Sequence, residues 1–120
     1  MSASPTARSG KRREDEALAH LERHGLVLLA RNYSCRIGEV DLVMRDDDTT
    51  VFVEVRYRRS AAHGGALASI SRAKAWRVAR AAQVYQKAVR APADAPIRFD
   101  VVAIDGSPGQ LRWLKAAFEF

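Results

Sequence analysis

Two valine-rich segments separated by four polar residues constrain the fold of this chain more than any other feature. Residues 39–44 (EVDLVM) and 50–57 (TVFVEVRY) have the β-branched and aromatic content of strands. Residues 46–49 (DDDT) have the composition of a tight turn. The segments are predicted to pair as a hairpin in which the numbers of paired residues add to about 95. Both faces carry apolar residues, which predicts a sheet covered on both sides, as in an α/β domain.

Helices and further strands are predicted around this hairpin. Apolar residues at helical spacing predict helices over about 12–24, ended by Gly25, and over about 72–90, capped by Ser69 or Ser71. The resulting order, α-β-β-β-α-β-(β/α), favours one mixed sheet flanked by helices. Residues 26–31 are predicted to form an edge strand, and residues 60–69 a loop. Residues 98–104 are predicted to form another strand, and residues 110–117 a last strand or a short helix.

The length of 120 residues predicts one domain. Residues 1–11 are predicted to be a disordered basic tail and residues 12–120 the folded domain. The start of the chain has no apolar stretch of the kind found in signal peptides or membrane anchors. Cys35 is the only cysteine, which favours a reducing compartment. We therefore expect a cytoplasmic protein with no membrane partner.

The distribution of charge indicates a polyanionic partner. The net charge is +6 and the pI about 10.1. Between Glu54 and Asp94 there is no acidic residue and there are nine basic ones. Such asymmetry favours nucleic acid, with DNA as the expected partner, over a basic surface that only aids solubility.

Carboxylates inside the two valine-rich segments are the strongest sign of chemistry. Acids in the middle of apolar strands are costly to bury unless a cation accompanies them. The numbers of Asp41 and Glu54 add to 95, so the hairpin would bring both side chains to one place. Oxygen ligands of this kind suit Mg²⁺ or Mn²⁺. The alternative is that Arg56 or another arginine neutralises one acid in an ordinary salt bridge.

Other polar side chains are predicted near this pair. Glu14 shares the apolar stripe of the first helix, although acids also occur in first helical turns because they oppose the helix dipole. Lys74 falls on the apolar face of the second helix, and together with Arg77 it either approaches phosphate or lies on a solvated flank. Trp76 and Trp113 either stack on bases or serve as packing.

Taken in order, several motifs resemble one family over residues 10–118. The chain resembles the YraN-like family of small bacterial proteins, which is placed in the PD-(D/E)XK nuclease superfamily beside archaeal Holliday-junction resolvases. The matching segments are Glu14 with Ala17 and Leu21, residues 30–33 (ARNY), 38–42 (GEVDL) and 52–56 (FVEVR), Lys74 with Arg77, residues 98–102 (RFDVV), and Ala117 with Phe118.

The resemblance implies a restriction-endonuclease-like core that cleaves DNA phosphodiester bonds, with branched or structured DNA among the expected substrates. It implies that Asp41 and Glu54 bind the metal ion, that the carbonyl of Val55 adds a ligand, and that Glu14 is an auxiliary acid. Junction resolution needs two cuts, so a homodimer is suggested by analogy.

Arg56 departs from the superfamily pattern, which has lysine two residues after the second acid. Arginine keeps the positive charge but does not give up its proton, so Arg56 cannot act as a general base. Either Arg56 acts electrostatically on the scissile phosphate, or Lys74 supplies the ammonium, or catalysis is weakened. In the last case the chain is a nucleic-acid-binding module or an adaptor on the same fold. In the nuclease reading Arg58, Lys74 and Arg77 bind flanking phosphates.

Overall fold

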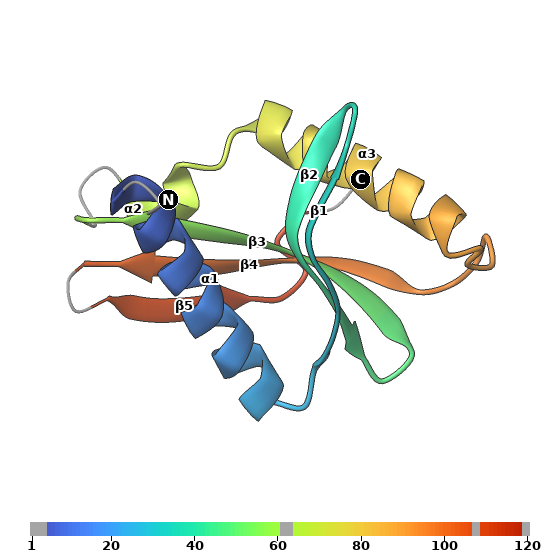
Figure 1. Ribbon diagram of the computed structural model, residues 1–120, viewed down its shortest axis with the longest axis horizontal. Helices are drawn as coiled ribbons and strands as arrows, with labels where there is room; N and C mark the ends of the chain where they lie inside the picture. The colour runs from blue at the N-terminus through green and yellow to red at the C-terminus, as the bar shows by residue number, and fades with distance from the viewer. Residues whose placement is uncertain (1–4, 61–63, 107–108, 119–120) are drawn as a thin grey trace.

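The structure, a computed structural model, describes residues 5–60, 64–106 and 109–118. Among these residues five strands form one sheet in the order β1-β2-β3-β4-β5, with β3 and β4 parallel and the other neighbours antiparallel (Figure 1). The strands are β1 (Val27–Cys35), β2 (Gly38–Asp46), β3 (Thr49–Arg58), β4 (Ile97–Asp105) and β5 (Gln110–Leu114), and the helices are α1 (Pro5–Arg23), α2 (Gly65–Ala68) and α3 (Arg72–Ala88).

Helices lie on both faces of this mixed sheet, so the predicted α/β class and element order are confirmed. The arrangement is consistent with a restriction-endonuclease-like core. The last element is a strand rather than a helix. None of the helices in the described ranges is long and apolar enough to span a membrane.

The hairpin of β2 and β3 has the predicted register but only over half its length. In every pair from Asp46–Thr49 to Leu42–Val53 the residue numbers add to 95. Beyond Leu42–Val53 the two strands separate: β2 stays paired with β1 as far as Gly38, whereas β3 stays paired with β4 as far as Arg58. Figure 1 shows β1 and β2 turning away together from β3 and β4. A V-shaped gap between two strands is therefore built into the middle of the sheet.

Helix α1 covers one face of the sheet, which we call the α1 face. Ala17 and Leu21 are fully buried there, and the helix ends as predicted at Gly25, whose φ of +91° suits the left-handed turn after a helix. The other fully or nearly fully buried members of this core come from the strands and the turn before β1, and are Leu26, Leu42, Met44, Val51, Val53, Val102 and Ile104.

The start of α1 corrects one prediction. The helix begins at Pro5, whereas the sequence predicted a start near Arg12 after a disordered tail. The physical reason is that proline has the φ of a first helical residue and needs no hydrogen bond there, and that residues 7–13 contain good helix formers. The rest of the predicted tail, residues 1–4, lies outside the described residues.

Helix α3 covers the opposite face, the α3 face, where Val78 and Ala82 pack on Val40, Val43 and Phe52. Its N-cap is Ser71, one of the two predicted: the Ser71 side chain accepts a hydrogen bond of 3.1 Å from the Lys74 backbone N–H. The turn between β1 and β2 approaches the helix closely. A Cβ atom at Gly38 would overlap the Arg77 carbonyl, so only glycine fits there.

The predicted loop over residues 60–69 contains a short helix, α2, which the sequence did not indicate. Ala66 is fully buried against Val101 and Ala103 of β4, and its N–H donates a 2.7 Å hydrogen bond to Asp105. Tertiary contacts with β4 therefore stabilise a helical turn that is too short for a periodic signal in sequence. Residues 61–63 of this segment lie outside the described residues.

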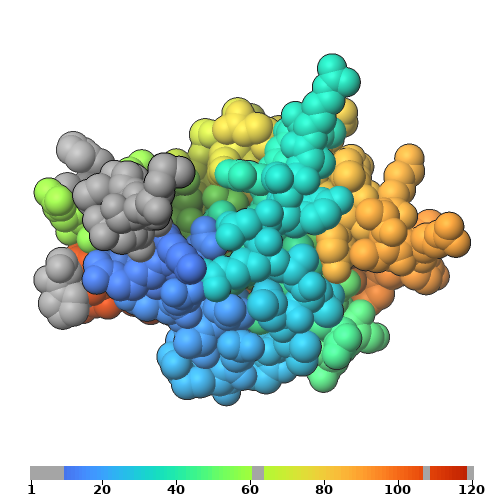
Figure 2. Space-filling model, viewed as in Figure 1, coloured from blue at the N-terminus to red at the C-terminus, as the bar shows by residue number. Residues whose placement is uncertain are grey.

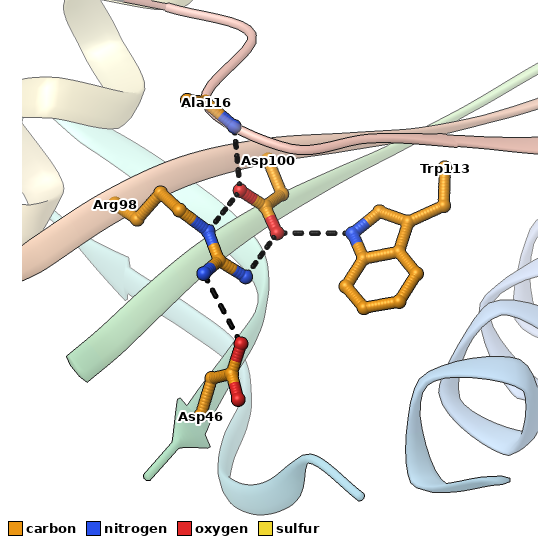
Figure 3. Close-up of polar contacts among 5 residues, drawn as sticks. All are labelled: Asp46, Arg98, Asp100, Trp113 and Ala116. Carbon is orange, nitrogen blue, oxygen red and sulfur yellow. Dashed lines mark hydrogen bonds and ion pairs between the residues drawn. The ribbon is translucent and has the colours of Figure 1, made fainter. Parts of the chain in front are cut away.

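Hydrogen bonds to the buried Asp100 join the segment after β5 to β4 (Figure 3). Asp100 is fully buried and accepts four hydrogen bonds of 2.8–3.0 Å: two from Arg98, one from the indole of Trp113 and one from the N–H of Ala116. Arg98 also donates to Asp46 at 3.1 Å. Each carboxylate oxygen of Asp100 has two donors, so this buried charge is fully paired.

Candidate functional site

The predicted pair of carboxylates lies where β2 and β3 separate. Asp41 and Glu54 each stand one residue beyond the last pair of the hairpin, Leu42–Val53. Oδ2 of Asp41 accepts a 2.8 Å hydrogen bond from the backbone N–H of Val55, which bridges the gap between the two strands. The side chain of Glu54 is only 3% exposed. The separation of the strands thus opens a place in the sheet that is filled by two acids instead of a backbone ladder.

Burial and mutual repulsion make this pair reluctant to ionise. Burial, and then the charge of Asp41, raise the pKa of Glu54 from 4.5 to about 8, against the opposing effects of Lys74 and Arg56. Burial also raises the pKa of Asp41, and the hydrogen bond from Val55 and the charge of Lys74 limit the rise. The neighbouring polar and cationic groups therefore do not fully stabilise the negative charges of Asp41 and Glu54 when both are ionised.

Lys74 is the cation that reaches the pair. Its Nζ lies 3.5 Å from Oε1 of Glu54, so the apolar-face position in α3 brings the ammonium into the gap rather than to a solvated flank. Oε2 of Glu54 is buried and accepts no hydrogen bond from a donor in the described residues. Glu54 and Asp41 can hydrogen-bond each other only while one of them holds a proton. When both are ionised, a divalent cation with oxygen ligands would satisfy the pair. The residues present therefore fit Mg²⁺ or Mn²⁺.

Glu14 lies close to this pair but has a partner of its own. Arg31 of β1 places Nε 3.5 Å from Oε1 of Glu14 and donates a hydrogen bond of 2.5 Å to Asp15. Burial, and then the charge of Asp41, raise the pKa of Glu14. In the described part of the chain no three His, Cys, Asp or Glu side chains converge so as to hold a metal ion by themselves. The charge of Asp41 thus acts on Glu14, but Glu14 does not form a three-carboxylate metal site with Asp41 and Glu54.

Arg56 is held from a different side. Its Nε donates a 3.1 Å hydrogen bond to Oγ of Ser69, and the Ser69 hydroxyl donates a 2.5 Å hydrogen bond to the carbonyl of Ala66 in α2. The short helix that the sequence did not predict therefore orients the guanidinium whose charge acts on Glu54. Arg58 and Arg77 are exposed, at the end of β3 and on α3, and the structure does not bring them onto the carboxylates.

Two hollows are lined in part by Glu14 and Lys74, the side chains whose charges act on Asp41 and Glu54. One hollow of about 580 Å³ is lined by Glu14 and Arg31 together with Gly10, Lys11 and Asn32. Another of about 350 Å³ lies at the β1–β2 turn and is lined in part by Lys74 and Arg77. Figure 2 shows a recess between the cyan atoms of β1 and β2 and the yellow atoms at the start of α3. Cationic side chains therefore border the approach to the buried acids.

Comparison with known proteins places the chain in a family. The model of the "Uncharacterised protein family UPF0102" matches residues 13–104. The chain belongs to the UPF0102 family. It is 51% identical over 114 residues to a UPF0102 protein of Pseudomonas fluorescens Pf-5, an alignment that covers 92% of this chain and 93% of that protein. It is 54% identical to UPF0102 proteins of Pseudomonas entomophila and Cupriavidus metallidurans, with 98% of this chain covered in both alignments and 97% and 85% of those proteins respectively.

UPF0102 is the YraN-like family that the motifs resembled, so that identification is confirmed. All the motifs quoted for it between Glu14 and Val102 lie within the matched residues. The family name carries no activity.

Three side chains that matter to this region were missed by the sequence analysis: Arg31, Ser69 and Asp100. Asp100 carried the signal that pointed to Asp41 and Glu54, namely an acid inside an apolar strand, and the structure gives it a saturated set of partners instead. Arg31 and Ser69 carried no signal, because their roles arise from contacts with residues 13 or more positions away in the sequence.

Proposed function

We propose that this UPF0102 protein is a metal-dependent endonuclease that hydrolyses phosphodiester bonds of DNA. The observation that supports this most is the pair formed by the half-buried Asp41 and the buried Glu54, held in a gap of the sheet, with one Glu54 oxygen that accepts no hydrogen bond from the described residues. A pair this costly to bury is explained if its normal state includes a bound divalent cation. The positive net charge and the cations around the gap supply attraction for a phosphate backbone.

Asp41 and Glu54 would hold Mg²⁺ or Mn²⁺, with the carbonyl of Val55 as a further ligand. When bound, the ion would lower the pKa of a coordinated water and neutralise charge on the scissile phosphate. Glu14 would add negative charge near Asp41 and favour the bound cation.

The chain's own cations would carry the remaining tasks. The Lys74 ammonium, 3.5 Å from Glu54, stands beside the carboxylates and can donate hydrogen bonds to a water or a phosphate oxygen there. The Arg56 guanidinium, fixed through Ser69, would stabilise the charge that develops on the phosphate. Arg58 and Arg77 would bind flanking phosphates. This division of roles removes the need for a lysine at position 56.

The first test is cleavage of fork, junction and single-stranded oligonucleotides with Mg²⁺ or Mn²⁺. Asp41→Asn and Glu54→Gln should abolish cleavage, whereas Asp48→Asn and Glu22→Gln, which make the same chemical changes at exposed positions, should leave it intact. Cleavage that is absent from the wild type, or unchanged in the site variants, would refute the proposal.

A second test measures the ion without any activity. Saturating Mn²⁺ should raise the melting temperature of the wild type, since a ligand at 100 times its Kd stabilises the folded state by about 2.7 kcal/mol. The same titration should leave Asp41→Asn and Glu54→Gln unchanged.

A second candidate function is a nucleic-acid-binding module or adaptor with weak or no catalysis. It is favoured by Arg56, which stands where the superfamily has lysine. Salt-sensitive DNA binding that survives both Asp41→Asn and Glu54→Gln, in a wild type that does not cleave, would favour that candidate.

A further inference from the structure

A groove of about 480 Å³ lies along α3, between the helix and the beginning of β4. Its apolar lining includes Trp76, Ala79 and Ala82 from α3, Pro92 from the following loop, and Ile97 and Phe99 from β4. Trp76 is 57% exposed and Ile97 43% exposed, so the groove presents an aromatic ring and an aliphatic wall to solvent. A surface of this kind on a small protein is large enough for a ring-sized ligand.

The polar groups of the groove narrow the chemistry of that ligand. Arg80 and Lys87 line it as exposed cations, and no acidic side chain is among the described residues that line it. Gln86 also lines it. The groove therefore combines a stacking surface with two positive charges.

A nucleotide matches both features together. A nucleobase has a flat face that stacks on tryptophan, and its phosphates are attracted by arginine and lysine. A neutral peptide would satisfy the apolar wall but not the two cations Arg80 and Lys87, and a second copy of this chain, with a net charge of +6, would be repelled by them. A base stacked inside a duplex cannot enter such a groove, whereas an unpaired base can.

We infer that this groove binds an unpaired nucleobase, and that the preferred substrate of the protein is DNA with a single-stranded segment next to the cleavage site. This inference rests on the proposed nuclease function and names its substrate class. The geometric link is α3 itself: Lys74, at the carboxylates, and Trp76, at the groove, are two residues apart and project from opposite sides of the helix. One strand could thus run from the buried acids around the start of α3 to the groove.

The test is binding by fluorescence anisotropy in EDTA, with a labelled single-stranded oligothymidylate, the same oligonucleotide carrying abasic sites, and a duplex of equal length. Trp76→Ala should weaken single-strand binding roughly 5- to 100-fold, the range for loss of one base-stacking aromatic side chain. Trp76→Phe should restore most of the affinity, and duplex binding should change less than about twofold. Abasic sites should weaken binding to the wild type and should have no further effect on Trp76→Ala.

Two matched controls separate the groove from general effects. Val27→Ala removes an apolar side chain with 47% exposure from β1 and should change nothing. Arg80→Glu and Arg45→Glu make the same change in net charge, and only the groove variant should lose more single-strand than duplex affinity. Equal losses on single strand and duplex, no effect of abasic sites on the wild type, or self-association that Trp76→Ala abolishes would overturn the inference.

The nuclease proposal and the groove proposal can be refuted independently of each other. Repeating the binding assay with Asp41→Asn tests the groove without the metal site. Base-dependent binding without any cleavage by the wild type would refute the nuclease and leave the groove as a nucleobase site. Metal-dependent cleavage with no dependence on Trp76 or on unpaired bases would refute the groove alone.

Discussion

Replacing Glu54 by glutamine should remove a loss of stability that the metal-free protein undergoes as the pH rises from about 5 to about 8. The pKa of Glu54 is about 8 in the folded chain and 4.5 when exposed, so between these values the folded state holds a proton that the unfolded state releases. The stability contributed by the protonated group is therefore complete below pH 4.5 and is lost as the pH rises toward 8. Each pKa unit corresponds to about 1.4 kcal/mol, so the loss is roughly 3–5 kcal/mol.

The assay is urea denaturation of wild type and Glu54→Gln in EDTA, at intervals from pH 5 to pH 9. Glutamine has the same shape and no charge, so the difference in unfolding free energy between variant and wild type reports the charge of Glu54 together with its effect on Asp41. The unfolding free energy of the variant minus that of the wild type should rise by roughly 3–5 kcal/mol between pH 5 and pH 9. At pH 9 the variant should be the more stable protein. Glu39→Gln makes the same change at an exposed position of β2 and should give a flat difference.

A difference between Glu54→Gln and wild type that stays constant from pH 5 to pH 9 would refute this reasoning. It would mean that the Lys74 ammonium neutralises Glu54 fully, and that the gap between β2 and β3 has no need of another cation. A difference that grows with pH in EDTA and shrinks when Mn²⁺ is added would instead show that the ion relieves the buried charge of Glu54.

Five further substitutions probe the site and the parts of the fold that hold it. Asp100→Ala should destabilise the protein by about 2–4 kcal/mol in urea denaturation, because it leaves the N–H groups of Trp113 and Ala116 without their acceptor and removes two hydrogen bonds from Arg98. Asp46→Ala should cost less than about 1 kcal/mol because that carboxylate is partly exposed. Ser71→Ala removes the cap of α3 and should lower the unfolding free energy by about 1 kcal/mol. Lys74→Met should reduce any cleavage rate by about 100-fold or more, the usual effect of losing one preorganised donor. Arg56→Lys should cleave at a rate within about tenfold of wild type. A larger loss of rate in Arg56→Lys than in Lys74→Met would mean that Arg56 is the principal cation.

The fold could be predicted from sequence wherever local patterns decide it. The register of the β2–β3 hairpin follows from the turn at residues 46–49 and the period of two in each strand. The start of α3 follows from the capping preference of Ser71, and the end of α1 from Gly25. The short helix α2 could not be predicted, because its stability comes from packing of Ala66 on β4, more than 30 residues later in the chain.

The convergence of Asp41 and Glu54 could be predicted, but the environment of the two side chains could not. Period and register brought Asp41 and Glu54 to the same place, but a regular hairpin would have continued through them. The separation of the strands at Leu42–Val53 depends on β1 and β4, each of which keeps its own neighbour beyond that point. No pattern within residues 38–58 encodes this, so neither the gap nor the burial of Glu54 in it could be inferred from those residues.

Acids inside apolar strands have two different outcomes in this one sheet, and the difference lies in how many donors reach each carboxylate. Asp100 receives four hydrogen bonds, two of them from an arginine on its own strand, so its charge is stable without any ligand. Glu54 has one ammonium at 3.5 Å from one oxygen, and its other oxygen accepts no hydrogen bond from the described residues. Neutralising Asp100 should therefore destabilise the fold at neutral pH, whereas neutralising Glu54 should stabilise the metal-free fold above its pKa of about 8. If Glu54→Gln stabilises the metal-free protein as expected, the Glu54 charge does not serve stability, which would agree with the proposal that it binds a divalent cation.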